Sequence, residues 1–137
     1  DMISVHVEAA KHLHKCLSTI KNEGLKAGVC LNPSTSLAAL EHIMDVIDYV
    51  NVLTVNPGFA GQTFIPSMYQ KIHKLSKLIE ASGYDILIQV DGNIGPHTIP
   101  HVVSNGAELL VCGTSSLFKK NINFEDAVQN VRKLIHQ

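Results

Sequence analysis

The feature that most constrains this sequence is an unbroken alternation of strand-like and helix-like segments along its 137 residues. Short runs rich in valine, isoleucine and leucine alternate with longer stretches whose apolar residues recur at helical spacing. This pattern predicts five consecutive βα units in a single domain, residues 1–137. The strands are predicted near residues 2–6, 27–31, 52–55, 86–90 and 109–112.

Apolar stripes and helix-ending residues define the helices between these strands. Gly24 and Gly83 are expected to end two of the helices, and Asn123 is expected to cap the start of the last one. The predicted stripes are Ala9, Leu13, Cys16, Leu17 and Ile20; Leu37, Leu40, Ile43 and Met44; Ile72, Leu75, Leu78 and Ile79; and Phe124, Val128, Val131 and Ile135.

The predicted strands are apolar on both faces, which is typical of a parallel sheet covered by helices. Two architectures have this pattern, an open doubly wound sheet and a (β/α)8 barrel. Periodicity alone does not separate them. A complete barrel takes about 200 to 250 residues, so as a barrel this chain would lack about three units.

Glycine stands in the loop after each of the last three predicted strands. The segments are Asn56–Gly61, Asp91–Asn93 and Gly113–Ser115. Both architectures bind ligands at the carboxyl ends of their strands. Glycine lets the main chain approach a ligand closely, and free N–H groups in such loops bind anions without a lysine. Any one of these glycines is explained by its turn, but three successive strand ends favour a phosphate site.

Asp91 is the one carboxylate that directly follows a predicted buried strand, in the run Ile88–Gly92. An ionised carboxylate at such a position is costly unless a metal or a hydrogen-bonding substrate meets it. The alternative is a side chain that caps its own loop. We therefore take Asp91 as the candidate chemical group of the site.

Eight histidines give a weaker signal. His12 with Cys16, and His97 with His101, have the i, i+4 spacing of metal ligands, but neither pair has a third ligand nearby and both lie on predicted helices. They are interpreted as surface or half-buried side chains. His6 ends the first predicted strand on the same rim as Asp91, where it either touches the site or fills the mouth of the barrel.

Composition excludes several classes of protein. The net charge is -1 with lysine and arginine scattered singly, which gives no basis for binding nucleic acid or an anionic membrane. No apolar stretch is long enough to span a bilayer. Cys30 and Cys112 lie in strand-like runs and are expected to be buried thiols, which favours a reducing, cytoplasmic location.

The stretch VNPGFAGQTFIPSM (55–68), with IQVDGNI (88–94) and CGTSSLF (112–118) behind it, resembles the ribulose-phosphate 3-epimerase family. The family pattern is a strand followed by NPGFGGQ.FIP, then VDGG, then GS or GTS. The likeness also includes SVHVEA (4–9) and GVCLNP (28–33). It implies an α/β chain of the (β/α)8 TIM-barrel family, covering about the last five βα units of an incomplete barrel.

The resemblance implies a metal-dependent 3-epimerisation of a ketose phosphate by two-base proton transfer through an enediolate. Asp91 matches the family's catalytic acid, which also binds the divalent metal (Zn, Fe, Mn or Co). The partner is a small sugar phosphate, and the full-length family member is a homo-oligomer. The matching substrate- and phosphate-binding positions are Gly58, Phe59, Ala60, Gly61, Asp91, Gly92, Asn93, Gly113, Thr114 and Ser115.

The sequence also departs from the family pattern. Asn93 replaces the second glycine of VDGG, Ala60 replaces a glycine, and Leu53 stands where the family commonly has methionine. The FAGQ and GTSSLF segments are closer to the allulose-6-phosphate branch than to the ribulose-5-phosphate branch. The family's second catalytic acid and its other metal ligands have no match.

We therefore expect the C-terminal five-eighths of an epimerase, inactive alone and prone to associate through its two end strands. A non-catalytic phosphate-binding α/β module, or another phosphate-binding barrel enzyme, is the alternative.

Overall fold

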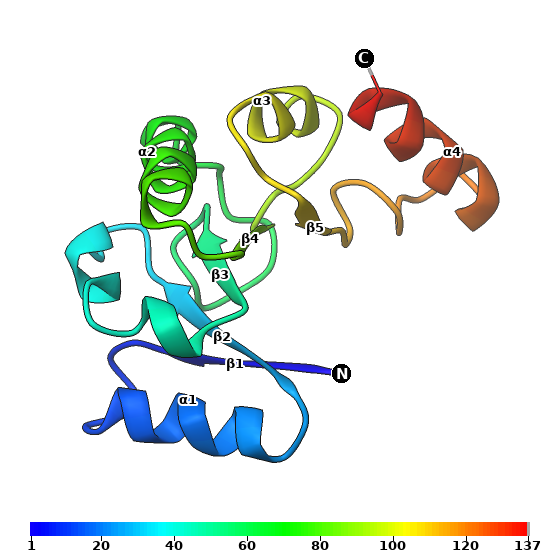
Figure 1. The fold of residues 1–137 in the computed structure, drawn as a ribbon. Coiled ribbons are helices and arrows are strands. Elements are labelled where there is room, and N and C mark those ends of the chain that lie inside the picture. Colours follow the sequence, from blue (N-terminus) through cyan, green and yellow to red (C-terminus); the bar gives the residue numbers. More distant parts are fainter. Residues whose placement is uncertain (137) are drawn as a thin grey trace.

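The computed structural model describes residues 1–136, which form one parallel sheet with helices packed against it (Figure 1). The sheet has five strands in the order β1-β2-β3-β4-β5, and every neighbouring pair is parallel. The strands are β1 (Met2–His6), β2 (Lys26–Leu31), β3 (Tyr49–Leu53), β4 (Leu87–Asp91) and β5 (Leu109–Val111).

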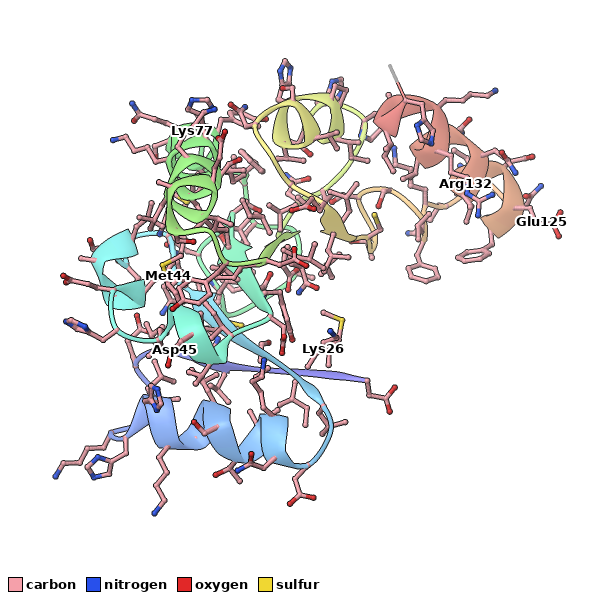
Figure 2. All side chains as sticks on the ribbon, in the orientation of Figure 1. Lys26, Met44, Asp45, Lys77, Glu125 and Arg132 are labelled. Carbon is pink, nitrogen blue, oxygen red and sulfur yellow. The ribbon has the colours of Figure 1, made fainter. Side chains whose placement is uncertain are left out.

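Helices follow the strands around the outside of this sheet. In Figure 1 they run from α1 at the bottom, through α2 and α3 at the top, to α4 beyond β5. Exposed charged side chains such as Lys77 on α2 and Glu125 and Arg132 on α4 lie on the outer side of the helices (Figure 2). The elements are α1 (Leu13–Asn22), the 3-10 helices η1 (Leu37–Leu40) and η2 (Met44–Val46), α2 (Ser67–Ser82), α3 (Ile99–Ser104) and α4 (Phe124–Ile135).

The strand order separates the two architectures that periodicity left open. A doubly wound sheet reverses its strand order at a switch point, where its ligands bind. Strands β1 to β5 are ordered as in the sequence without any reversal. That is the arrangement of consecutive strands in the wall of a (β/α)8 barrel. The carboxyl ends of all five strands therefore lie at the same edge.

The core lies between the sheet and its helices. Val29, Val50 and Val90 contribute fully buried side chains from three neighbouring strands. Ile72 and Leu75 of α2 pack against them from the helical layer, and both are also fully buried. Burying a side chain of this size stabilises the fold by about 1.5–3 kcal/mol. The five strands are thereby fixed relative to one another, which fixes the loops at their carboxyl ends.

Strand β3 begins earlier than the predicted 52–55 and ends at Leu53 rather than Val55. Its first residue, Tyr49, pairs with Gly28 of β2, and a Cβ atom built on Gly28 would stand 2.4 Å from the Tyr49 ring. The missing side chain of Gly28 thus makes room for the aromatic ring. The β-branched run drew the prediction toward residues 52–55, where the chain is already turning into its loop.

Five other predictions need correction. Leu78 of the predicted α2 stripe is 38% exposed, so it does not face inward. Helix α1 starts at Leu13, so Ala9 lies in the preceding turn. The stripe from Leu37 to Met44 does not form one helix but belongs to the 3-10 helices η1 and η2 and the turn between them. Phe124 opens α4 but is 55% exposed, because the face turned inward is centred on Ala127. Cys112 is only partly buried, because β5 forms the end of the described sheet.

Candidate active site

The loops that follow β3, β4 and β5 meet around one cavity of about 220 Å³. Each loop contributes several lining residues, and the cavity therefore lies at the carboxyl edge of the sheet. Nine of the ten predicted site residues line it; Gly58 does not. The lining residues are Val55, Phe59, Ala60, Gly61, Gln62, Asp91, Gly92, Asn93, Ile94, Val111, Gly113, Thr114 and Ser115.

The loop after β3 is closed at its base and open at its tip. The N–H of Ile65 donates a hydrogen bond to the carbonyl of Thr54 over 2.8 Å, which joins the two ends of the loop. Gly58 and Gly61 have positive φ angles of 143° and 83°, a conformation that L side chains rarely adopt. Phe59 between them is 76% exposed. The loop thus extends over the cavity from a fixed base.

The carboxyl-terminal end of this loop is held by aromatic packing. Phe64 is buried, and its ring stacks on Tyr69 of α2 with 4.6 Å between the ring centroids. Tyr69 in turn meets His101 of α3 edge-on at 5.5 Å. Burial raises the pKa of the Tyr69 hydroxyl, so the group stays neutral at ordinary pH. These contacts anchor the end of the loop to two helices.

Asp91 is the last residue of β4 and the only carboxylate among the described residues that line the cavity. Its side chain is half-buried, and this burial raises the pKa of the Asp91 carboxyl above its usual value of 3.8. A raised pKa favours the protonated form, which is the form that donates a proton. The environment of Asp91 therefore suits general acid chemistry.

Gly92, the next residue, has no room for a side chain. Its φ is +129°, and a Cβ atom there would stand 2.7 Å from Val55 Cγ2 and 3.0 Å from Thr54 Oγ1. The loop after β4 therefore packs directly against the end of β3 and the start of the loop that follows. Asn93 also has a positive φ, 51°, which asparagine tolerates better than most residues.

The loop after β5 lines the cavity and has main-chain N–H groups without a partner among the described residues. The carbonyl of Gly113 accepts hydrogen bonds from the N–H groups of Ser116, Leu117 and Phe118, at 3.2, 2.9 and 3.1 Å. Within residues 1–136 the N–H groups of Thr114 and Ser115 donate no hydrogen bond. Both residues line the cavity, so these N–H groups are available to an anion.

Several residues of the site are not among the predicted ones. Four further residues line the cavity next to the predicted motifs: Val55, Gln62, Ile94 and Val111. Their position beside a glycine loop is the sequence signal that could have identified them. Thr54 was also missed. It is fully buried at the end of β3 and carried no signal beyond its place before the Asn-Pro-Gly turn.

The histidines do not gather at the cavity. His6 lies half-buried at the end of β1 and is absent from the lining residues. Among the residues that the structure describes, no group of three or more His, Cys, Asp or Glu side chains is placed to hold a metal ion. The three cysteines are free thiols. No helix of the described part is both long and apolar enough to cross a membrane.

Comparison with known proteins places this geometry in context. Residues 1–118 match the family described as the ribulose-phosphate 3 epimerase family. The chain is 47% identical over 116 residues to the ribulose-phosphate 3-epimerase of Bacillus subtilis (strain 168), a match that covers 84% of this chain and 54% of that protein.

Two further relatives match nearly the whole chain. The ribulose-phosphate 3-epimerase of Synechocystis sp. is 43% identical over 134 residues, which cover 96% of this chain and 57% of that protein. The chloroplastic ribulose-5-phosphate-3-epimerase of Arabidopsis thaliana is 40% identical over 134 residues, covering 96% of this chain and 47% of that protein. The chain thus spans about half the length of the curated relatives it matches.

Proposed function

Because the chain belongs to the ribulose-phosphate 3-epimerase family, we propose that its strand-end loops form part of the active site of a ketose-phosphate 3-epimerase. The family is built on a TIM barrel, and β1 to β5 are five consecutive parallel strands. One observation carries the proposal. The three loops after β3, β4 and β5 surround a single cavity, and Asp91 is the only carboxylate that residues 1–136 contribute to its lining.

Asp91 acts as the proton donor on one face of the sugar. Epimerisation at C3 of a 2-ketose removes the proton next to the carbonyl, which leaves an enediolate, and returns a proton to the opposite face of C3. The raised pKa of Asp91 supports its role as the acid that returns this proton. Inversion needs a base on the other face as well. Since no second carboxylate of the described residues lines the cavity, we expect the 137-residue chain alone to show no turnover.

The glycine loops bind the phosphate group of the substrate. The N–H groups of Thr114 and Ser115, which have no partner within residues 1–136, support this role, and Gly113 leaves open space beside them. Gly61 and Ala60 approach from the loop after β3, and Gly92 from the loop after β4. The loop around Phe59 closes over the bound sugar, and its fixed base at Thr54 and Ile65 allows the tip to move alone.

A divalent metal would polarise the substrate carbonyl and stabilise the enediolate in this family. The described residues do not by themselves fit such an ion. The cavity offers one carboxylate, and a lone carboxylate binds a divalent ion weakly. Asp91 would supply one ligand, and the others would come from outside residues 1–136.

The proposed substrate is ribulose 5-phosphate, because the relatives from Bacillus subtilis and Synechocystis are named ribulose-phosphate 3-epimerase and the one from Arabidopsis thaliana is named ribulose-5-phosphate-3-epimerase. Allulose 6-phosphate is the alternative that the FAGQ and GTSSLF segments favour. Three free thiols support a reducing compartment such as the cytoplasm. We also propose that the full-length protein forms a homo-oligomer.

The test is a chimera in which this chain is joined to the part of the Bacillus subtilis enzyme that it does not match. Turnover is assayed with ribulose 5-phosphate and with allulose 6-phosphate, with and without added divalent metal. We expect Asp91→Asn to lower kcat by more than about tenfold, since it removes the acid. The matched control adds Asn93→Asp to the Asp91→Asn variant, which moves the carboxylate by two positions and should restore no turnover.

Two outcomes would reject the proposal. Turnover of the Asp91→Asn chimera within about tenfold of the parent would show that Asp91 is not the acid. A folded chimera that binds inorganic phosphate but turns over neither sugar would support a non-catalytic phosphate-binding module instead.

A further inference from the structure

Thr54 joins two parts of the site, the end of β4 with its loop and the loop after β3, through three hydrogen bonds. Its backbone N–H donates to the carbonyl of Asp91 at 3.0 Å, and its Oγ1 donates to the carbonyl of Gly92 at 2.5 Å. Its own carbonyl accepts from the N–H of Ile65 at 2.8 Å. One fully buried residue therefore holds both the end of β4, where Asp91 lies, and the base of the loop after β3.

The main-chain bonds of Thr54 continue the sheet, but the side-chain bond does not. Register pairs Leu53 with Asp91, so the bond from the Thr54 N–H to the Asp91 carbonyl continues the ladder of β3 and β4. Any non-proline residue would make this bond. The bond from Oγ1 to Gly92 lies beyond the last register pair and needs a hydroxyl. It holds the peptide between Gly92 and Asn93, whereas the peptide between Asp91 and Gly92 is held by the main-chain bond.

The path of the loop as it leaves Asp91 depends on the peptide between Gly92 and Asn93. Gly92 has a φ of +129°, and a glycine in this region has few steric limits of its own. The hydroxyl of Thr54 and the side chain of Val55 lie 2.7–3.0 Å from the position of a Gly92 Cβ and thus close off one side of the loop. The hydrogen bond holds the loop against this wall.

We infer that Thr54 is a positioning residue, which through its hydroxyl holds the Gly92–Asn93 peptide, fixes the turn that begins directly after Asp91, and thereby keeps the Asp91 carboxylate in place at the cavity. This inference rests on the proposed function for its effect on turnover. A valine at this position would have nearly the same shape but would leave the carbonyl of Gly92 without this donor. A serine would keep the donor and lose only a methyl group.

The experiment compares Thr54→Val with Thr54→Ser in the Bacillus chimera. We expect Thr54→Val to lower kcat by about tenfold or more with KM changed by less than about threefold, because it displaces the turn next to the acid and leaves the N–H groups of Thr114 and Ser115 in place. Thr54→Ser should keep kcat within about threefold of the parent value. Thermal unfolding of each variant is measured in parallel.

A second readout does not depend on turnover. In the 137-residue chain, the pKa of the Asp91 carboxyl is followed by carbon NMR as the pH is changed. Thr54→Ser should keep the raised pKa, and Thr54→Val should lower it toward the ordinary value as the loop moves into solvent. If the parent chimera has no turnover, the proposed function fails, and this titration still decides the role of Thr54.

Three results would overturn the inference. One is a Thr54→Val variant with unchanged kcat and an unchanged pKa of Asp91. Another is equal loss of kcat in the valine and serine variants, which would point to the methyl group. A Thr54→Val protein that does not fold would show that the hydroxyl is needed for the fold rather than for the placement of Asp91.

Discussion

Replacing Gly113 with valine separates access to the anion site from the stability of the fold. Apart from Gly113 and its two chain neighbours, no atom of the described residues lies within 4 Å of a Cβ built on Gly113, and its φ lies outside the range that strains an L residue. The valine side chain would therefore project into open space beside the cavity that Gly113 lines. We expect the free energy of unfolding to change by less than about 0.5 kcal/mol, as for a surface substitution.

The effect on phosphate binding should be much larger. A valine here would keep an anion from the N–H groups of Thr114 and Ser115, which have no partner within the described residues. Hydrogen bonds to a charged group contribute about 1.5–3 kcal/mol, and about 1.4 kcal/mol corresponds to a tenfold change in Kd. Loss of one such bond therefore predicts a rise in Kd for inorganic phosphate of about 10- to 150-fold.

The assay is an NMR titration of the 137-residue chain with inorganic phosphate, alongside urea unfolding. Gly113→Ala is the graded variant and should give an intermediate Kd. Ala81→Val, on the exposed end of α2, is the control that adds bulk away from the cavity and should leave Kd unchanged. An unchanged Kd in Gly113→Val, together with chemical shifts of Thr114 and Ser115 that do not respond to phosphate, would refute the reasoning.

Three further predictions follow from single residues. Asp91→Asn should leave the free energy of unfolding unchanged below pH 3.8. As the pH rises from there through the raised pKa of Asp91, the variant should become more stable than the wild type, because folding favours the neutral carboxyl. Urea unfolding at several pH values checks this. Gly92→Ala should cost about 1–3 kcal/mol in urea unfolding, since its Cβ would stand 2.7 Å from Val55 Cγ2 at a φ of +129°. Asn123→Ala should cost about 1 kcal/mol and Asn123→Ser much less in the same assay, because Asn123 Oδ1 accepts from the N–H of Asp126 at the start of α4, and a serine hydroxyl keeps an acceptor there without a second negative charge beside Asp126.

The order of elements could be predicted because each strand and helix has its own local pattern. Buried strands such as Leu87–Asp91 are short and apolar, and α2 has a clear stripe that ends at Gly83 in the left-handed conformation. Strand β3 was placed three residues late because Tyr49 and Asn51 interrupt the β-branched run. Its true start depends on Gly28, which is 21 residues away in sequence. A local pattern does not contain that pairing.

The same limit applies to the candidate site. The glycine loops and Asp91 follow strands, and parallel strands bring their carboxyl ends together, so their meeting could be predicted from order alone. Gly58 was included because it belongs to the same motif, yet its neighbours line the cavity and it does not. Thr54 could not be found this way. Its importance comes from hydrogen bonds to Gly92 and Ile65, which lie in separate segments.

Gly92 and Gly113 follow the same sequence pattern but have different roles in the structure. In the sequence both follow a strand, and both were interpreted as places where the main chain approaches a ligand. In the structure a side chain at Gly92 would collide with Val55 and Thr54, whereas a Cβ at Gly113 would meet no atom of the described residues. Gly92 is therefore required by packing between two loops, and Gly113 by access to the cavity. Substitution at Gly92 should mainly lower the stability of the fold, and substitution at Gly113 should mainly lower the affinity for phosphate.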